Sequence, residues 1–133
     1  MTDTVLILGG TGKIGRHSTE AFAAAGWRVR QFDRHSDDMA SAAQGCDVIV
    51  NGLNPQKYHN WQGTIPRITA QVIAAARQSG ATVVLPGTVY HFGDQGGTWS
   101  ERTPANPVSR KGRIRLDMER AYADSGVQTI VLR

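Results

Sequence analysis

One stretch near the N-terminus reads Leu6-Ile7-Leu8-Gly9-Gly10-Thr11-Gly12-Lys13-Ile14-Gly15. Residues 4–8 form a β-branched and aliphatic run that ends at glycines, and from Gly12 onward apolar residues recur at the spacing of a helix. The stretch therefore predicts a buried strand, a sharp turn and a helix in direct succession, and this unit decides the fold.

The glycines of this stretch follow the spacing G-x-x-G-x-x-G, a variant of the dinucleotide fingerprint. Gly9 would let the chain turn off the strand, Gly12 would bring backbone N–H groups near a pyrophosphate, and Gly15 would let helix and strand pack closely. A glycine triplet alone also fits an ordinary tight turn, but its place between strand and helix favours a nucleotide. The predicted cofactor-binding residues of the turn are Gly9, Thr11, Gly12, Lys13, Ile14 and Gly15.

An acidic residue follows the second predicted strand, at residues 27–32. Asp33 comes about twenty residues after the glycine motif, where a Rossmann fold places the acid that binds the adenosine ribose. Arg34 follows at once, and an arginine attracts the 2'-phosphate that a carboxylate repels. The adjacent acid and arginine leave the choice between NAD and NADP open, with NAD favoured. The alternative interpretation is an exposed Asp-Arg pair at a strand end, without a role in binding.

The rest of the chain alternates between strands and helices. Strands are expected at residues 46–50, 81–85 and 127–132, and helices at 39–44, 63–79 and 108–125. Ser36 is the expected N-cap of the first of these helices, and Pro66 should lie in the first turn of the second. Asn51, Gly52 and Leu53 follow a strand, so we expect them at the ligand-binding edge of the sheet. Residues 88–107 form a long predicted loop, of the kind that is usually functional.

This alternation implies right-handed crossovers and a doubly wound, mainly parallel Rossmann-type sheet with helices on both faces. The 133 residues are enough for one domain with a real core, at 40% hydrophobic and 20% charged residues.

Composition limits the other classes of function. The net charge is +4, but the basic residues are spread out and no nucleic-acid motif accompanies them. The four histidines have no ligand spacing, which predicts no metal. Cys46 is the only cysteine, and there is no signal segment or long apolar run, so we expect a cytoplasmic protein without a membrane contact.

Together these motifs resemble the extended short-chain dehydrogenase/reductases, the NAD-dependent epimerase/dehydratase family. The resemblance covers residues 4–133 and also draws on the segment Thr88-Val89-Tyr90. It implies that Thr88 is the catalytic hydroxyl and Lys111 the lysine of a Tyr-x-x-x-Lys pair. Pro107 stands where that pair requires tyrosine. Either Tyr90 is a substitute acid, or Lys111 holds only the cofactor ribose while another group does the acid–base work, or there is no chemistry. Tyr90 is otherwise a wall of the substrate site.

The resemblance has three further implications. Only one short helix fits between Asp33 and Cys46, so the sheet should have one edge strand fewer than usual, which leaves an expected strand order of 2-1-3-4-5. Family members continue past residue 133 into a substrate-binding half, so we interpret residues 1–133 as the cofactor-binding portion of an oxidoreductase for a small carbonyl or sugar-nucleotide substrate. The alternative is a catalytically inactive NAD(P)-sensing or regulatory protein. The helices at 63–79 and 108–125 suggest a homodimer.

Overall fold

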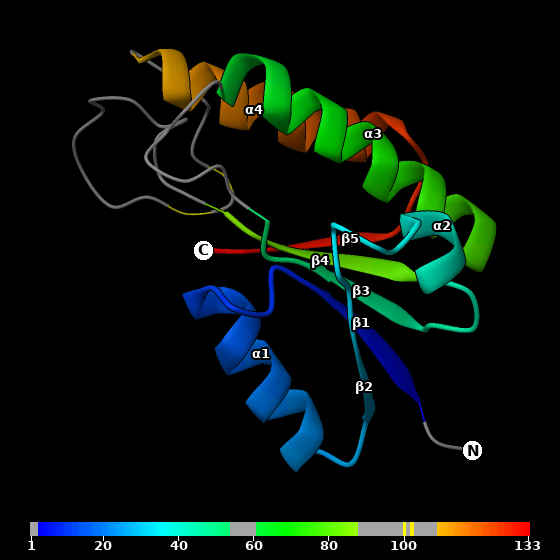
Figure 1. Ribbon diagram of the computed structural model, residues 1–133. Helices are drawn as coiled ribbons and strands as arrows, with labels where there is room; N and C mark the ends of the chain where they lie inside the picture. The colour runs from blue at the N-terminus through cyan, green and yellow to red at the C-terminus, as the bar shows by residue number, and fades with distance from the viewer. Residues whose placement is uncertain (1–2, 54–60, 88–99, 101, 103–108) are drawn as a thin grey trace.

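The computed structural model describes residues 3–53, 61–87, 100, 102 and 109–133. Within these residues, five strands form one sheet in the order β2-β1-β3-β4-β5 (Figure 1). The strands are β1 (Thr4–Leu8), β2 (Arg28–Gln31), β3 (Val48–Asn51), β4 (Thr82–Pro86) and β5 (Thr129–Leu132). The helices are α1 (Lys13–Ala24), α2 (Met39–Ala42), α3 (Trp61–Ser79) and α4 (Arg110–Asp124). The predicted strand order is confirmed.

All of these strands are paired in parallel, because each connection returns the chain over a face of the sheet. Val5 of β1 lies opposite Val29 of β2 on one side and Val48 of β3 on the other. Every residue of β1 is buried, as expected for a central strand covered on both faces. The carboxyl ends of β1, β2 and β3 therefore meet at one edge of the sheet, where open α/β sheets bind ligands.

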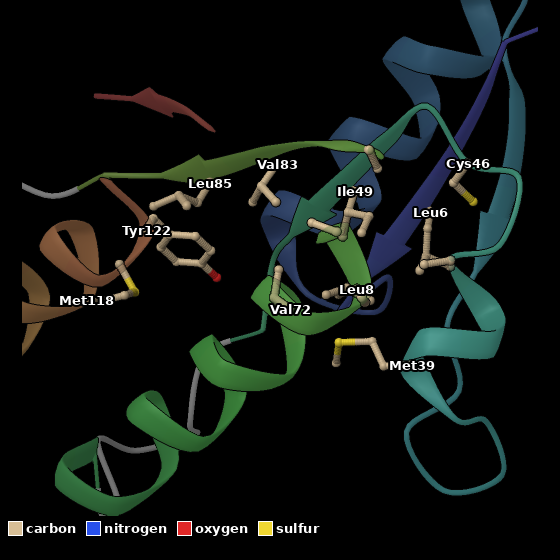
Figure 2. Packing of buried hydrophobic residues seen from close by; sticks show 14 of the residues in the cluster. Leu6, Leu8, Met39, Cys46, Ile49, Val72, Val83, Leu85, Met118 and Tyr122 are labelled. Atoms are coloured by element: carbon tan, nitrogen blue, oxygen red, sulfur yellow. The ribbon is translucent and has the colours of Figure 1, made fainter. Parts of the chain in front are cut away.

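The helices form a layer on each face of the sheet. Figure 1 shows α1 alone on one face and α2, α3 and α4 on the other. On the α1 side, Val5, Ile7 and Val50 pack with Phe22 and Trp27. The larger part of the core lies between the sheet and the other three helices, and Figure 2 shows Tyr122 of α4 pointing into it. The predicted helices on both faces are confirmed.

Two local expectations were wrong. Asp38, not Ser36, caps α2: its carboxylate accepts from the Ser41 N–H at 3.0 Å, while the Ser36 N–H donates to the Asp33 carbonyl in the preceding turn. Pro66 lies beyond the first turn of its helix, because α3 begins at residue 61 and not at 63. One helical N–H is therefore missing in the second turn of α3.

Candidate dinucleotide-binding site

The glycine motif lies in a bend between β1 and α1. Gly9 follows the strand with φ of +76°, a conformation that other residues rarely adopt. The Gly12 N–H donates to the Gly9 carbonyl at 3.0 Å and closes the turn. Gly12 is also the N-cap of α1, with extended backbone (φ −80°, ψ 173°). The chain thus turns directly from the end of a central strand into a helix.

Three glycines make this edge of the sheet compact. A Cβ at Gly9 would lie 2.7 Å from the Gly52 carbonyl oxygen, and one at Gly52 would lie 2.8 Å from the Leu8 carbonyl oxygen. A Cβ at Gly15 would collide with the Gly9 carbonyl. The end of β1, the start of α1 and the end of β3 are therefore in backbone contact, which needs glycine at each position.

Gly12 differs from these three glycines. A Cβ there would have one neighbour within 4 Å among the described residues, the Gly9 carbonyl oxygen at an ordinary 3.5 Å. The protein itself thus leaves room for a side chain at residue 12. Glycine at this position keeps the space beside the helix N-terminus free.

The N-terminus of α1 favours an anion. No side chain caps it, and its first turn contains no acidic residue. The first N–H groups of a helix have no acceptor within the helix and carry the positive end of its dipole. Lys13 and Arg16 are exposed beside them, as is Thr11 in the turn. Ile14 is 44% exposed, an apolar side chain at the surface next to these donors.

Asp33 lies just beyond the carboxyl end of β2 and is fixed by its own turn. Its carboxylate accepts from the His35 N–H at 2.9 Å, and its own N–H donates to the Asp37 carboxylate at 2.8 Å. The hydrogen bond from the His35 backbone, with another from the Ser36 side chain, lowers the pKa of Asp33. This exposed carboxyl group is therefore ionised at neutral pH.

The side chain of Asn51 points into the core. Its amide nitrogen donates to the Tyr122 hydroxyl at 3.1 Å, and its amide oxygen accepts from the Leu53 N–H at 3.2 Å. Both groups are buried, so Asn51 joins β3 to α4 and holds the start of the segment after β3. Burial raises the pKa of Tyr122 to about 12. Sequence reasoning missed Tyr122, although it lies four residues after Met118, at helical spacing.

A cleft of about 290 Å³ opens at the same edge of the sheet, between the end of β2, the start of α2 and α3. It brings the predicted residues Arg34 and Leu53 together. Arg67 of α3 lines the cleft as well, and sequence reasoning did not single it out. The signal was weak, since an exposed arginine on a helix is ordinary.

Comparison with protein families identifies the chain. The sequence model of the NAD dependent epimerase/dehydratase family matches residues 5–133. The chain belongs to this family. A comparison with curated proteins found no significant match.

Solved structures of the epimerase/dehydratase fold are similar along nearly the whole chain. UDP-N-acetylglucosamine 4-epimerase from Bacillus cereus has a TM-score of 0.81 at 17% identity, over 99% of this chain and 60% of that one. UDP-glucuronic acid 4-epimerase from Bacillus cereus, in complex with NAD, has a TM-score of 0.76 at 17% identity, over 98% of this chain and 56% of that one. dTDP-4-dehydrorhamnose reductase from Bacillus anthracis, in complex with NADP, has a TM-score of 0.78 at 18% identity, over 98% of this chain and 52% of that one. The chain thus spans little more than half the length of these proteins.

The catalytic residues expected from the family are placed only in part. Lys111 is half-buried in the first turn of α4, which Ser109 caps by accepting from the Gly112 N–H at 3.0 Å. Thr88, Tyr90 and Pro107 lie outside the described residues. Among the described residues, no three histidine, cysteine or acidic side chains gather as metal ligands. In the same part of the chain, no helix is long and apolar enough to cross a membrane.

Proposed function

We propose that residues 1–133 form the NAD(P)-binding domain of an oxidoreductase of the epimerase/dehydratase family. The observation that carries this proposal is the bend from Gly9 to Gly15, with an uncapped helix N-terminus and open space at Gly12. The pyrophosphate would accept hydrogen bonds from the first N–H groups of α1, with Lys13 beside it. The adenosine would lie in the cleft beside Asp33, and Gly52 and Leu53 would flank the cofactor.

The substrate we propose is a small carbonyl compound or a sugar nucleotide. A bound nicotinamide cofactor supplies a hydride acceptor or donor. Support comes from the family match and from the similar structure of MoeE5 in complex with UDP-glucose and NAD. In the proposed reaction, Thr88 hydrogen-bonds the substrate oxygen, Lys111 binds the cofactor ribose, and Tyr90 exchanges the hydroxyl proton. The family match favours this oxidoreductase over a catalytically inactive sensor.

The cofactor proposal is tested by titrating the chain with NADH and NADPH and following the fluorescence of the reduced nicotinamide. Gly12→Val is the informative variant, because the extended backbone and free space at Gly12 accept a side chain that would enter the phosphate position. Ala23→Val, exposed near the other end of α1, is the matched control. We expect saturable binding by the wild type and the control, and at least about tenfold weaker binding by Gly12→Val. If neither cofactor binds at millimolar concentration, the proposal is wrong.

We also propose that the protein forms a homodimer in the cytoplasm. The dimer is supported by a mainly apolar groove of about 440 Å³ between α3 and α4, lined in part by Ile73, Ile114 and Ala121. The cytoplasmic location is supported by the lone Cys46, which is reduced and buried. Sedimentation velocity should give a dimer for the wild type and for Ala23→Glu, and a monomer for Ala121→Glu. A monomeric wild type would contradict the dimer.

A further inference from the structure

A glutamine at the end of β2 lies against the glycine turn. Gln31 is the last residue of β2 and stands opposite Ile7 of β1 in the parallel register. Ile7 packs on the α1 side of the sheet. Paired residues of neighbouring strands point to the same face, so the Gln31 side chain lies on the side of α1 as well. From this position it reaches the turn that follows β1.

The carboxamide of Gln31 occupies the space that a side chain at residue 10 would need. A Cβ at Gly10 would lie 2.1 Å from the Gln31 Oε1 atom and 3.1 Å from its Cδ atom, and the third-nearest atom is Gln31 Nε2 at 3.7 Å. Gly10 does not have the positive φ that Gly9 has, so its backbone angles would accept another residue. The contact with Gln31 therefore favours glycine at residue 10.

Two consecutive hydrogen bonds hold the carboxamide in this place. Gln31 Nε2 donates to the Thr19 hydroxyl oxygen at 2.8 Å. The Thr19 hydroxyl in turn donates to the Gly15 carbonyl at 2.8 Å. The Thr19 hydroxyl accepts one bond and donates the other, so the two bonds run in the same direction and reinforce each other. They join the end of β2 to the first turn of α1.

The glycine turn is thus held from two sides. On the β3 side, the Gly52 backbone lies close against Gly9, and on the β2 side, the Gln31 side chain lies against Gly10. Glycine has more backbone freedom than any other residue, so a ligand that orders a glycine-rich turn pays for the freedom that is lost. A side chain that already restricts the turn lowers this cost.

We propose that Gln31 is a positioning residue of the cofactor site. Together with Thr19, it holds the turn at Gly10 in the shape that presents the first N–H groups of α1 to the pyrophosphate. The inference rests on the proposed cofactor function and adds a residue that acts on the turn and not on the cofactor. The Gln31 side chain is exposed, so its removal should loosen the turn without disturbing the core.

A double-mutant cycle tests this role. We would titrate the 133-residue chain with whichever of NADH and NADPH it binds more tightly, and then titrate Gln31→Ala, Thr19→Val and the double variant. Thr19→Ser keeps the hydroxyl, and Gln78→Ala, an exposed glutamine in the last turn of α3, is the matched control. Hydrogen exchange of the Gly12 N–H, which closes the turn on the Gly9 carbonyl, measures the turn in the free chain. Urea unfolding measures the stability of each variant.

Gln31→Ala should bind the cofactor about fivefold more weakly than the wild type, which is the factor that one hydrogen bond is worth. Thr19→Val should also bind more weakly, and the double variant should bind no more weakly than Gln31→Ala, because both changes break the same chain of bonds. Thr19→Ser and Gln78→Ala should bind like the wild type. The Gly12 N–H should exchange faster in Gln31→Ala, while the urea midpoint should stay close to that of the wild type.

The other outcomes separate this inference from the proposed function. Wild-type affinity in Gln31→Ala, or losses that add up in the double variant, would overturn the inference and leave the cofactor site in place. Weaker binding with unchanged exchange at Gly12 would also overturn it, since Gln31 would then contact the cofactor directly. Weaker binding that only accompanies a lower urea midpoint would reduce Gln31 to a structural residue and overturn the inference. If the wild type binds neither cofactor, the proposed function fails and this inference fails with it.

Discussion

Replacing Tyr122 by phenylalanine tests how the ligand-binding edge is attached to the core. The Tyr122 side chain is 1% exposed, and its hydroxyl accepts from the Asn51 amide at 3.1 Å. Tyr122→Phe keeps the ring but leaves a buried Asn51 donor without its acceptor, which costs about 1 to 3 kcal/mol. We therefore expect the free energy of unfolding at pH 7 to fall by that amount.

The same residue predicts an alkaline loss of stability. Burial raises the pKa of Tyr122 from the ordinary value of 10.0 to about 12. Between these values the unfolded chain loses the phenol proton while the folded chain keeps it. The stabilisation is therefore complete below pH 10 and is lost as the pH rises toward 12, by about 2 to 3 kcal/mol in all. Tyr122→Phe should lack this component of the pH dependence.

Urea unfolding from pH 7 to pH 11.5 measures both effects, and a double-mutant cycle with Asn51→Ala isolates the hydrogen bond. The cycle should give a coupling energy of about 1 kcal/mol. Two results would refute the reasoning. One is a variant as stable as the wild type at pH 7. The other is a variant that loses as much stability as the wild type at high pH.

Three further predictions concern the turn, the thiol and the helix cap. Gly15→Ala should lower both the stability and the cofactor affinity, because the added Cβ collides with the Gly9 carbonyl. Gly12→Ala is the control and should unfold in urea like the wild type. A Gly15→Ala variant as stable as the wild type would contradict this. Cys46 is 3% exposed, and burial raises the pKa of its thiol. The thiol should therefore react with a disulfide reagent at neutral pH only when the chain unfolds. Rapid labelling of the folded protein would be inconsistent with this packing. Ser109→Ala removes the acceptor for the Gly112 N–H and should lower the free energy of unfolding in urea by about 1 kcal/mol. An unchanged free energy of unfolding would show that the cap is not needed.

The sequence predicted those parts of the fold that depend on local pattern. The apolar run at residues 4–8 and the glycines after it are a local signal, and they correctly predicted β1, the bend and α1. The alternation of strands and helices predicted the parallel sheet, and the strand order followed from the family resemblance once one edge strand was removed between Asp33 and Cys46. The family was also recognised correctly, because the glycine motif is its most specific segment.

Contacts between distant residues could not be predicted in this way. Asn51 and Tyr122 are 71 residues apart, and nothing local to either one indicates the other. Arg34 and Arg67 line the same cleft only because α3 packs against the short helix α2 that follows β2. The cap of α2 was misplaced because Ser36 and Asp38 are both good N-caps, and the hydrogen bonds of the preceding turn decide between them.

The most direct test of the central claim is a backbone amide NMR titration of the chain with NAD⁺ and, separately, with NADP⁺. If the pyrophosphate lies at the N-terminus of α1, the amide signals of residues 11–15 should shift strongly and saturate at the same concentration as the change in nicotinamide signals. The amide signals at the far end of α1, around Ala23, should not shift. Saturable binding that leaves residues 11–15 unshifted would contradict the claim that the glycine turn holds the cofactor.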